Sequence, residues 1–316
     1  MSEKSNEVLI CGSLAFDTIT RFEGHFKDHI LPDTIHSLSV SFLVPNMRKE
    51  FGGCAGNIAY NLKLLGGSPI PVAAVGKDFG DYQQHFQKLG IEQRGIAVLD
   101  DVFTAQCHIT TDLSGNQISA FHPGAMSFAA DNDISNEKAV WAIVAPDAKD
   151  AMFKHAERLQ AAGIPFVFDL GQAMPLFDGD DLIEMIKMAR VLTANDYEMA
   201  VIEQRTGKKV EELAASLEAV IVTLGAEGSV LYHQGQKIEI KAVPAVKVED
   251  PTGCGDSHRA GVLYGLSSGW SWEDSARLGN VMGSIKIASG GPQNHAPSLD
   301  EIKRIFTENY DSNPWD

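Results

Sequence analysis

The chain has 316 residues, of which 44% are hydrophobic and 22% are charged, values typical of a globular protein with a large buried core. Its 26 basic and 42 acidic residues give a formal net charge of −16, which disfavours binding to nucleic acid or to an anionic membrane. No apolar run is long enough to span a bilayer, and the polar residues 1–6 lack the apolar core of a signal peptide. We therefore expect a cytoplasmic protein whose partners include neither nucleic acid nor membrane.

The four cysteines, Cys11, Cys54, Cys107 and Cys254, lie far apart and form no Cys-x-x-Cys pair or His/Cys cluster. Structural zinc sites and disulfide scaffolds both depend on grouped or regularly spaced cysteines. The sequence therefore predicts neither.

The N-terminal part of the chain predicts a buried strand followed by a small projecting sheet. Residues 8–11 form an apolar run that ends in Gly12-Ser13, which is typical of a buried strand. Asp17 lies just past the carboxyl end of this strand, where open α/β sheets bind ligands; the alternative is an exposed loop acid. Residues 18–22 and 35–43 are β-like and interrupt the β–α rhythm, so we expect them to form a separate small sheet.

Residues 52–66 predict a helix that is preceded by small residues. Gly52 and Gly53 allow close approach of the backbone, and apolar residues then recur at helical spacing as far as Gly66. Asn57 lies near the start of this predicted helix, where it could cap the helix or contact a ligand.

The remainder of the chain alternates strands with helices, which predicts a parallel, doubly wound sheet without a linker or an internal repeat. The predicted strands of this sheet are residues 72–75, 140–144, 166–169, 191–193 and 219–223, whereas residues 103–111 and 117–121 flank a predicted hairpin turn at residues 112–116. The predicted helices are residues 81–89, 148–162, 182–188, 197–206 and 210–217.

Residues 249–261 carry the sharpest chemical signal. Pro251 ends the preceding element, and Gly253 and Gly255 allow backbone angles and close approaches that a Cβ would forbid. The residues from Asp256 onward suit a tightly packed helix, whose first N–H groups would form an anion site. Asp256 lies inside that site, where a substrate hydroxyl could meet a phosphoryl group. The alternative is a tight loop in which Asp256 only caps the helix.

Residues 250–261, Asp-Pro-Thr-Gly-Cys-Gly-Asp-Ser-His-Arg-Ala-Gly, resemble the C-terminal signature of the PfkB (ribokinase-like) family of sugar and nucleoside kinases. Residues 52–66 resemble the family's other signature, Gly-Gly-x-x-x-Asn-x-Ala ending in Leu-Gly. The resemblance implies a ribokinase-like α/β fold, in which helices flank a doubly wound, mostly parallel sheet and a small β-sheet forms a lid. It also implies a single domain over residues 1–316, with the lid inserted from about 16–50 and 100–122.

The resemblance assigns roles to individual residues. Asp256 matches the family's general base, and the amides of Gly253, Cys254 and Gly255 match its anion hole. The residues that match contacts to the sugar or nucleoside are Ser13, Asp17, Gly52, Gly53 and Asn57.

Other matches concern the nucleotide and the ions, and they imply ATP and Mg²⁺ as cofactors. Glu198 matches an acid that orients a water-bound Mg²⁺, although Asn195 and Glu198 could equally form a helix cap. Carbonyls or hydroxyls near Asp250, Thr252 and residues 288–291 suggest a K⁺ site, as in many relatives. The residues that match contacts to ATP are Asn195, Glu198, Thr223, Gly225, Gly228, Thr252 and Gly255.

Further segments resemble the ribokinase-like adenosine kinases of bacteria and favour a nucleoside over a free sugar. Phe42 and Phe121 could pack against a purine or belong to the core of the lid, and Gln172 offers a donor and an acceptor to a base edge. Cys107 stands where such an adenosine kinase can present an aromatic residue, which makes the base preference less secure. The segments are residues 12–17, 31–32, 39–44, 121–126, 193–198 and 250–253.

The sequence thus predicts an adenosine kinase that uses ATP to phosphorylate the nucleoside 5′-hydroxyl, giving AMP and ADP. The alternatives are a PfkB kinase for inosine, guanosine or a sugar such as ribose, and a non-catalytic nucleotide-binding protein of the same fold. A nucleophilic role for Cys254 or His258 is a further, weaker alternative. The apolar run at residues 42–44, expected to be covered on both faces, predicts a homodimer joined through the lids.

Overall fold

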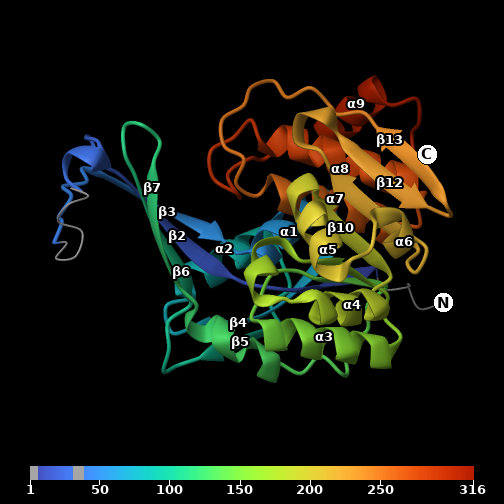
Figure 1. Cartoon of the computed structure of the whole chain (residues 1–316), viewed down its shortest axis with the longest axis horizontal. Helices are drawn as coiled ribbons and strands as arrows, with labels where there is room; N and C mark the ends of the chain where they lie inside the picture. The colour runs from blue at the N-terminus through green and yellow to red at the C-terminus, as the bar shows by residue number, and fades with distance from the viewer. Residues whose placement is uncertain (1–5, 31–38) are drawn as a thin grey trace.

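The computed structural model describes residues 6–30 and 39–316, and these residues form two sheets (Figure 1). The larger sheet has the strand order β13-β12-β11-β10-β9-β8-β1-β4-β5. Neighbouring strands are parallel from β5 to β11, and β12 and β13 extend the sheet in antiparallel fashion. Its strands are β1 (Glu7–Cys11), β4 (Ser68–Gly76), β5 (Ile96–Leu99), β8 (Trp141–Val144), β9 (Phe166–Asp169), β10 (Val191–Asn195), β11 (Ala219–Thr223), β12 (Ser229–His233) and β13 (Gln236–Ile240).

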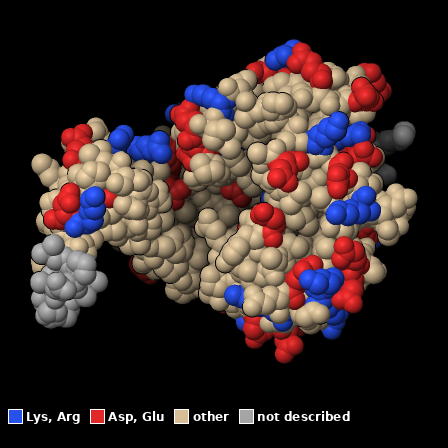
Figure 2. Space-filling view, turned by 45° about the horizontal axis from the view of Figure 1, so that its top comes forward, with Lys and Arg blue, Asp and Glu red and all other residues tan. Residues whose placement is uncertain are grey.

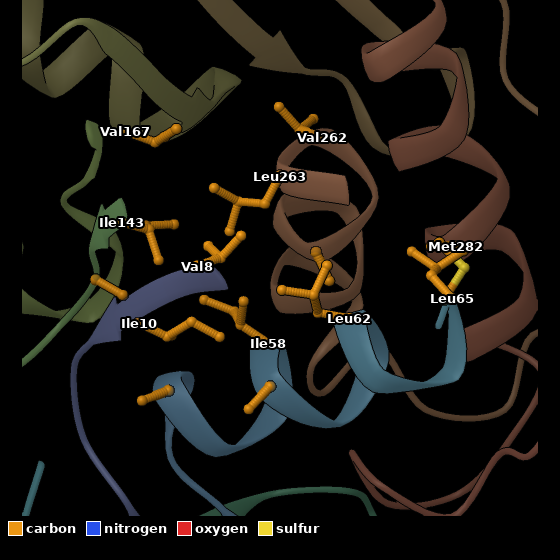
Figure 3. Packing of buried hydrophobic residues seen from close by; sticks show 14 of the residues in the cluster. Val8, Ile10, Ile58, Leu62, Leu65, Ile143, Val167, Val262, Leu263 and Met282 are labelled. Atoms are coloured by element: carbon orange, nitrogen blue, oxygen red, sulfur yellow. The ribbon is translucent and has the colours of Figure 1, made fainter. Parts of the chain in front are cut away.

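Helices cover both faces of this sheet, because adjacent residues of a strand point to opposite faces and both sets are apolar. In β1, Val8 and Ile10 pack into a cluster with α1, α7 and α8 (Figure 3), whereas Leu9 and Cys11 pack into a second cluster with α3 and α4. The helices are α1 (Cys54–Leu64), α2 (Gly80–Leu89), α3 (Lys149–Ala162), α4 (Gly179–Met188), α5 (Asp196–Thr206), α6 (Val210–Ala214), α7 (Cys254–Ser267), α8 (Trp272–Lys286) and α9 (Leu299–Asn309).

The smaller sheet projects from the main body as a lid, at the left of Figure 1, and has the order β3-β2-β6-β7. The register places Glu50, Asp17, Cys107 and Phe121 directly opposite one another across the four strands. Residues in register share one face of a sheet, so these four side chains form a row on the lid. The strands are β2 (Ala15–Arg21), β3 (Asn46–Gly52), β6 (Ala105–Thr111) and β7 (Gln117–His122). The predicted mostly parallel sheet with a small lid sheet is confirmed.

One predicted lid strand is wrong. Residues 39–44 are not in a strand, and the second lid strand is β3, whose polar sequence Asn-Met-Arg-Lys-Glu-Phe-Gly is largely exposed and shows no apolar alternation. Leu43 is 87% exposed, so this chain alone does not cover both faces of the apolar run at residues 42–44. Residues 31–38, which include the Leu-Pro segment and part of the predicted strand, lie outside the described residues.

Among the described residues, no helix combines the length and the apolar character that crossing a membrane requires.

Candidate active site

The predicted site residues gather between the lid and the carboxyl ends of the parallel strands. Asp169 ends β9, and Asn195 at the end of β10 lies opposite Thr223 at the end of β11. Figure 2 shows a hollow between the lid and the main body, with acidic side chains on its walls. Because open α/β sheets bind ligands at this edge, the hollow is the candidate site.

The start of α7, where the sequence predicts an anion site, lies in this region. Gly253 precedes the helix with φ of 79°, and a Cβ there would lie 2.9 Å from the Cβ of Pro292. Gly255 in the first turn is exposed. The first N–H groups of a helix have no partner within it, so these amides can bind an anion.

Asp256, in the same first turn, is held by a chain of side-chain hydrogen bonds. Asn57 of α1 donates from Nδ2 to Oδ2 of Asp256 at 2.8 Å, and Gln293 Nε2 donates to Oδ1 of Asn57 at 3.0 Å. Gln293 also donates to the hydroxyl of Tyr82 at 2.7 Å, and that hydroxyl donates to the carbonyl of Gly52 at 2.8 Å. The two PfkB-like segments are thereby joined, and Asn57 orients the carboxylate.

Sequence reasoning did not find Gln293 or Tyr82. Tyr82 lies on the buried face of the amphipathic helix α2, where it is indistinguishable from a core residue. Gln293 lies in a loop without a recognisable motif. Only the folded structure brings both to Asn57.

Burial sets the protonation of Asp256. Burial raises the pKa of this carboxyl from 3.8 to about 6, although the hydrogen bond from Asn57 works in the opposite direction. A carboxylate with a pKa near 6 is deprotonated at neutral pH and still basic enough to accept a proton from a hydroxyl that is being phosphorylated.

A buried arginine balances the acids beneath α7. Arg259 donates from Nε and Nη2 to the two carboxylate oxygens of Asp169, at 3.1 and 3.0 Å, and both side chains are about 5% exposed. Its Nη2 also lies 3.8 Å from Oε2 of Glu198. The arginine thus fixes Glu198 relative to the first turn of α7. Neither Arg259 nor Asp169 was singled out from the sequence, because each occupies an ordinary position in a helix or at a strand end.

Asn195 and Glu198 form a capping box at the start of α5. The backbone N–H of Glu198 donates to Oδ1 of Asn195 at 2.7 Å, and the N–H of Asn195 donates to Oε2 of Glu198 at 2.8 Å. Burial, and then the charge of Asp169, raise the pKa of Glu198. No group of three or more His, Cys, Asp or Glu residues among those described could hold a metal ion alone. One carboxylate fits Mg²⁺ that keeps most of its waters and binds phosphate oxygens.

Asp17 lies just past the end of β1, as the sequence predicted, and it belongs to strand β2, which does not fit the alternative of an exposed loop acid. A Cβ at Gly52 would lie 2.5 Å from Oδ2 of Asp17, so a larger residue at this position would displace the carboxylate from its observed place. Burial, and then the charge of Glu50, raise the pKa of Asp17 to about 6. The Oγ of Ser13 accepts a hydrogen bond from the N–H of Cys54, the first residue of α1, at 3.2 Å.

The three candidate base contacts have different surroundings. The ring of Phe42 lies 4.8 Å from that of Phe22 and 5.0 Å from that of Phe26, as the lid-core alternative expects. Phe121 is 55% exposed and belongs to the row that contains Asp17. Gln172 is exposed at the start of the short helix η4 (Gly171–Leu176) that follows β9.

The glycines of the predicted nucleotide loop have conformations that favour glycine. Gly225 has φ of 57°, and Gly228 has φ of 100° with its Cβ position 2.2 Å from the carbonyl oxygen of Ile240. They form the turn between Thr223 and β12, beside the start of α5. At Gly225 nothing lies within 4 Å of the Cβ position, so this part of the backbone offers room for a phosphate to approach.

The nucleophile alternative is not supported. Burial raises the pKa of Cys254 to about 11, and burial lowers the pKa of His258 to about 3. The thiol is therefore protonated and the imidazole neutral at pH 7. A nucleophilic cysteine would need a thiolate, which this environment disfavours.

The sequence pattern of the pfkB family carbohydrate kinases matches residues 23–299. The chain belongs to this family. It is accordingly an ATP-dependent kinase that transfers a phosphoryl group to an alcohol, and the ribokinase-like fold is confirmed.

Solved structures and curated relatives agree with this assignment. The nucleoside kinase of Burkholderia thailandensis, solved in complex with inosine, is 45% identical and superposes with a TM-score of 0.88, covering 97% of this chain and 99% of the other. The nucleoside kinase of Methanocaldococcus jannaschii is 29% identical over 96% of this chain and 97% of its own length. The structure of that protein superposes with a TM-score of 0.88, covering 97% of this chain and 100% of the other.

We predict a steep acid limb in the pH profile of kcat/KM. The pKa values of Asp256 and Asp17 are both raised to about 6, and each group acts as a carboxylate, so activity is lost as pH falls through about 6. Below that pH, kcat/KM should fall about 100-fold per pH unit in the parent protein and about tenfold per unit in Asp17→Asn. The measurement is kcat/KM from pH 4.5 to 8 in both proteins. A profile that stays flat from pH 7 to 5 would contradict both assignments.

Proposed function

We propose that the protein is a nucleoside kinase that transfers the γ-phosphoryl group of ATP to the 5′-hydroxyl of a purine nucleoside. The observation that carries the proposal is the carboxylate of Asp256 at the exposed N-terminus of α7, oriented by Asn57. Adenosine is the first candidate and gives AMP and ADP as products. Inosine is the second candidate, because the Burkholderia thailandensis relative is described in complex with it.

In this proposal Asp256 accepts the proton of the 5′-hydroxyl while that oxygen attacks the γ-phosphorus in line. The amides of Gly253 and Gly255 would stabilise the charge on the transferring group, because the first N–H groups of a helix have no partner within it and lie at the positive end of its dipole. The amide of Cys254, the third that the sequence suggested, donates instead to the carbonyl of Pro251 at 3.1 Å. Glu198 would hold Mg²⁺ through water, and the ion would supply further charge neutralisation to the phosphates. The proposed reaction uses no K⁺ ion, because the ammonium group of Lys286 already donates a hydrogen bond to the carbonyl of Asp250, near which the sequence suggested the ion.

The lid would supply recognition of the nucleoside. Asp17 is a half-buried carboxylate beside Gly52, and a carboxylate binds vicinal hydroxyls with charge-assisted hydrogen bonds. Phe121 shares its face of the lid and is exposed, so it can pack against a base. Closure of the lid would also exclude water, which would otherwise compete with the 5′-hydroxyl for the γ-phosphate.

A panel of acceptors tests the proposal, with ribose, adenosine, inosine, guanosine and the 2′- and 3′-deoxyadenosines as substrates. We expect turnover of a purine nucleoside, and losses in kcat/KM of about 10- to 100-fold for the deoxy analogues and for Asp17→Asn, the usual effect of losing a hydrogen bond to a charged group. Asp28→Asn, which alters an exposed acid elsewhere on the lid, is the matched control.

Three outcomes of this panel would contradict the proposal, each in a different way. Turnover of ribose but of no nucleoside would make the protein a sugar kinase. Binding of nucleosides without ADP formation would favour the non-catalytic alternative. Equal use of adenosine and its deoxy analogues would remove Asp17 from the ribose hydroxyls.

We also propose a homodimer joined through the lids. The lid exposes large apolar side chains that a single chain does not cover: Leu43, Met47 and Ile118 are 87%, 71% and 44% exposed. Exposed apolar area on a thin sheet favours pairing with a second copy.

Sedimentation at micromolar concentration should therefore show a dimer, and Leu43→Asp should dissociate it. Val246→Asp is the control, because Val246 is 92% exposed but lies outside the lid. A monomeric parent protein, with and without nucleoside, would leave closure over substrate as the role of the apolar lid surface.

A further inference from the structure

Lys286, the last residue of α8, is a fully buried lysine in an unusual setting. Its Nζ donates hydrogen bonds to the carbonyl oxygens of Asp250 at 2.8 Å and of Ser289 at 3.0 Å, and its exposed fraction is 0%. A buried ammonium group is costly unless its hydrogen bonds are satisfied. Its position at the carboxyl end of a helix also favours a positive charge.

The two carbonyls belong to two segments that are tied together at this point. The backbone N–H groups of Glu249 and Asp250 both donate to the carbonyl of Ile287, at 2.9 and 3.2 Å. The carboxylate of Asp250 accepts from the N–H of Gly291 at 2.8 Å and from the N–H of Thr252 at 2.9 Å. These hydrogen bonds hold the segment that leads into the first turn of α7 against residues 286–291, and Lys286 donates two of them.

This arrangement does not fit the K⁺ ion that the sequence suggested near Asp250 and Thr252. Protein K⁺ sites surround the ion with several backbone carbonyl oxygens that replace its hydration shell. Here the carbonyl oxygens of Asp250 and Ser289 already face a positive charge on Lys286. A second cation among them would meet electrostatic repulsion at contact distance.

The groups that face Lys286 favour its charged form. The nearby charges are Asp250 and Glu249 from one segment, with Arg48 as an opposing cation, and the thiol of Cys254 lies on α7. Burial lowers the pKa of Lys286, while the negative charge of Asp250 opposes that change. Two carbonyl acceptors and an adjacent carboxylate are the surroundings of an ammonium ion.

We propose that Lys286 is a positioning residue that takes the place of a bound monovalent cation, so that phosphoryl transfer does not depend on K⁺. Its ammonium group holds residues 249–253 in the conformation that aims the amides at the start of α7 toward the phosphoryl group. The inference rests on the proposed reaction at Asp256. It goes beyond that reaction, because it gives Lys286, which contacts neither the nucleoside nor ATP, a role in shaping the anion site.

The first test uses the unaltered protein. We measure kcat/KM with the accepted nucleoside in K⁺, Na⁺ or choline chloride at constant ionic strength, after exhaustive removal of K⁺. The rates should agree within about twofold, since surface screening is the same in the three salts. A K⁺-specific stimulation of about tenfold or more would overturn the inference.

The second test removes the ammonium group. Lys286→Met should lower kcat/KM about 10- to 100-fold, because two buried carbonyls lose their donor, and Lys286→Ala should lower it similarly. In Lys286→Ala, which leaves room for an ion, K⁺ should restore at least about fivefold of the loss while Na⁺ restores less. Lys187→Met is the matched control, because Lys187 also lies in the last turn of a helix but is exposed. Unchanged activity in Lys286→Met would contradict the inference.

A readout without activity separates this inference from the proposed function. In thermal unfolding, K⁺ should raise the midpoint of Lys286→Ala relative to Na⁺ and leave that of the parent protein unchanged, because only the variant has a vacant cation site. A parent protein that K⁺ stabilises specifically would contradict the role of Lys286. If the parent protein phosphorylates no nucleoside in the acceptor panel, the proposed function fails, and the thermal comparison still decides whether Lys286 replaces the ion.

Discussion

The site depends on keeping one carboxylate buried and correctly aimed at the start of a helix. Burial raises the pKa of Asp256, and the positive end of the α7 dipole and the amide of Asn57 oppose that rise. Gln293 donates to Asn57 and to Tyr82, and Tyr82 in turn donates to the backbone carbonyl of Gly52. A single chain of contacts therefore connects the glycine pair at the root of the lid to the proposed base.

A protein with a net charge of −16 must bind a polyanion by local means. The exposed amides at the start of α7 provide one such means, and they add no mobile positive charge. Two cations near the site are buried and already paired. Arg259 neutralises Asp169 and lies against Glu198, and Lys286 donates hydrogen bonds to backbone carbonyls. Both lie behind the proposed site, so in the proposed reaction the phosphates would meet mainly backbone N–H groups.

The sequence predicted the elements whose signal is local. Apolar runs at β1, β9 and β11 and the glycine turn before α7 each reflect burial or backbone geometry over a few residues, and all lie where they were expected. The strand β3 was misplaced because it is polar and exposed, so its pairing with β2 leaves no apolar pattern. The antiparallel extension by β12 and β13 was not anticipated either, although the turn at Gly225 and Gly228 that leads into it was recognised for another reason.

Contacts between distant segments were beyond the reach of the sequence. Motif resemblance placed Asn57 at the substrate, whereas the structure shows its amide also bound to Asp256, 199 positions away. Gln293, Arg259 and Lys286 carry no motif of their own, and their partners lie on other elements. Their roles become visible only in the folded structure, where each one satisfies a buried charge or a buried polar group.

The central claim is that Asp256 acts as the general base in phosphoryl transfer. The most direct measurement compares Asp256→Asn with the parent protein in steady-state turnover and in ATP binding. If the claim holds, the variant binds ATP normally and its kcat falls by a factor on the order of 10² to 10⁴, the usual contribution of a positioned base. Turnover within about threefold of the parent protein would contradict the claim, because the reaction would then proceed without a carboxylate at this position.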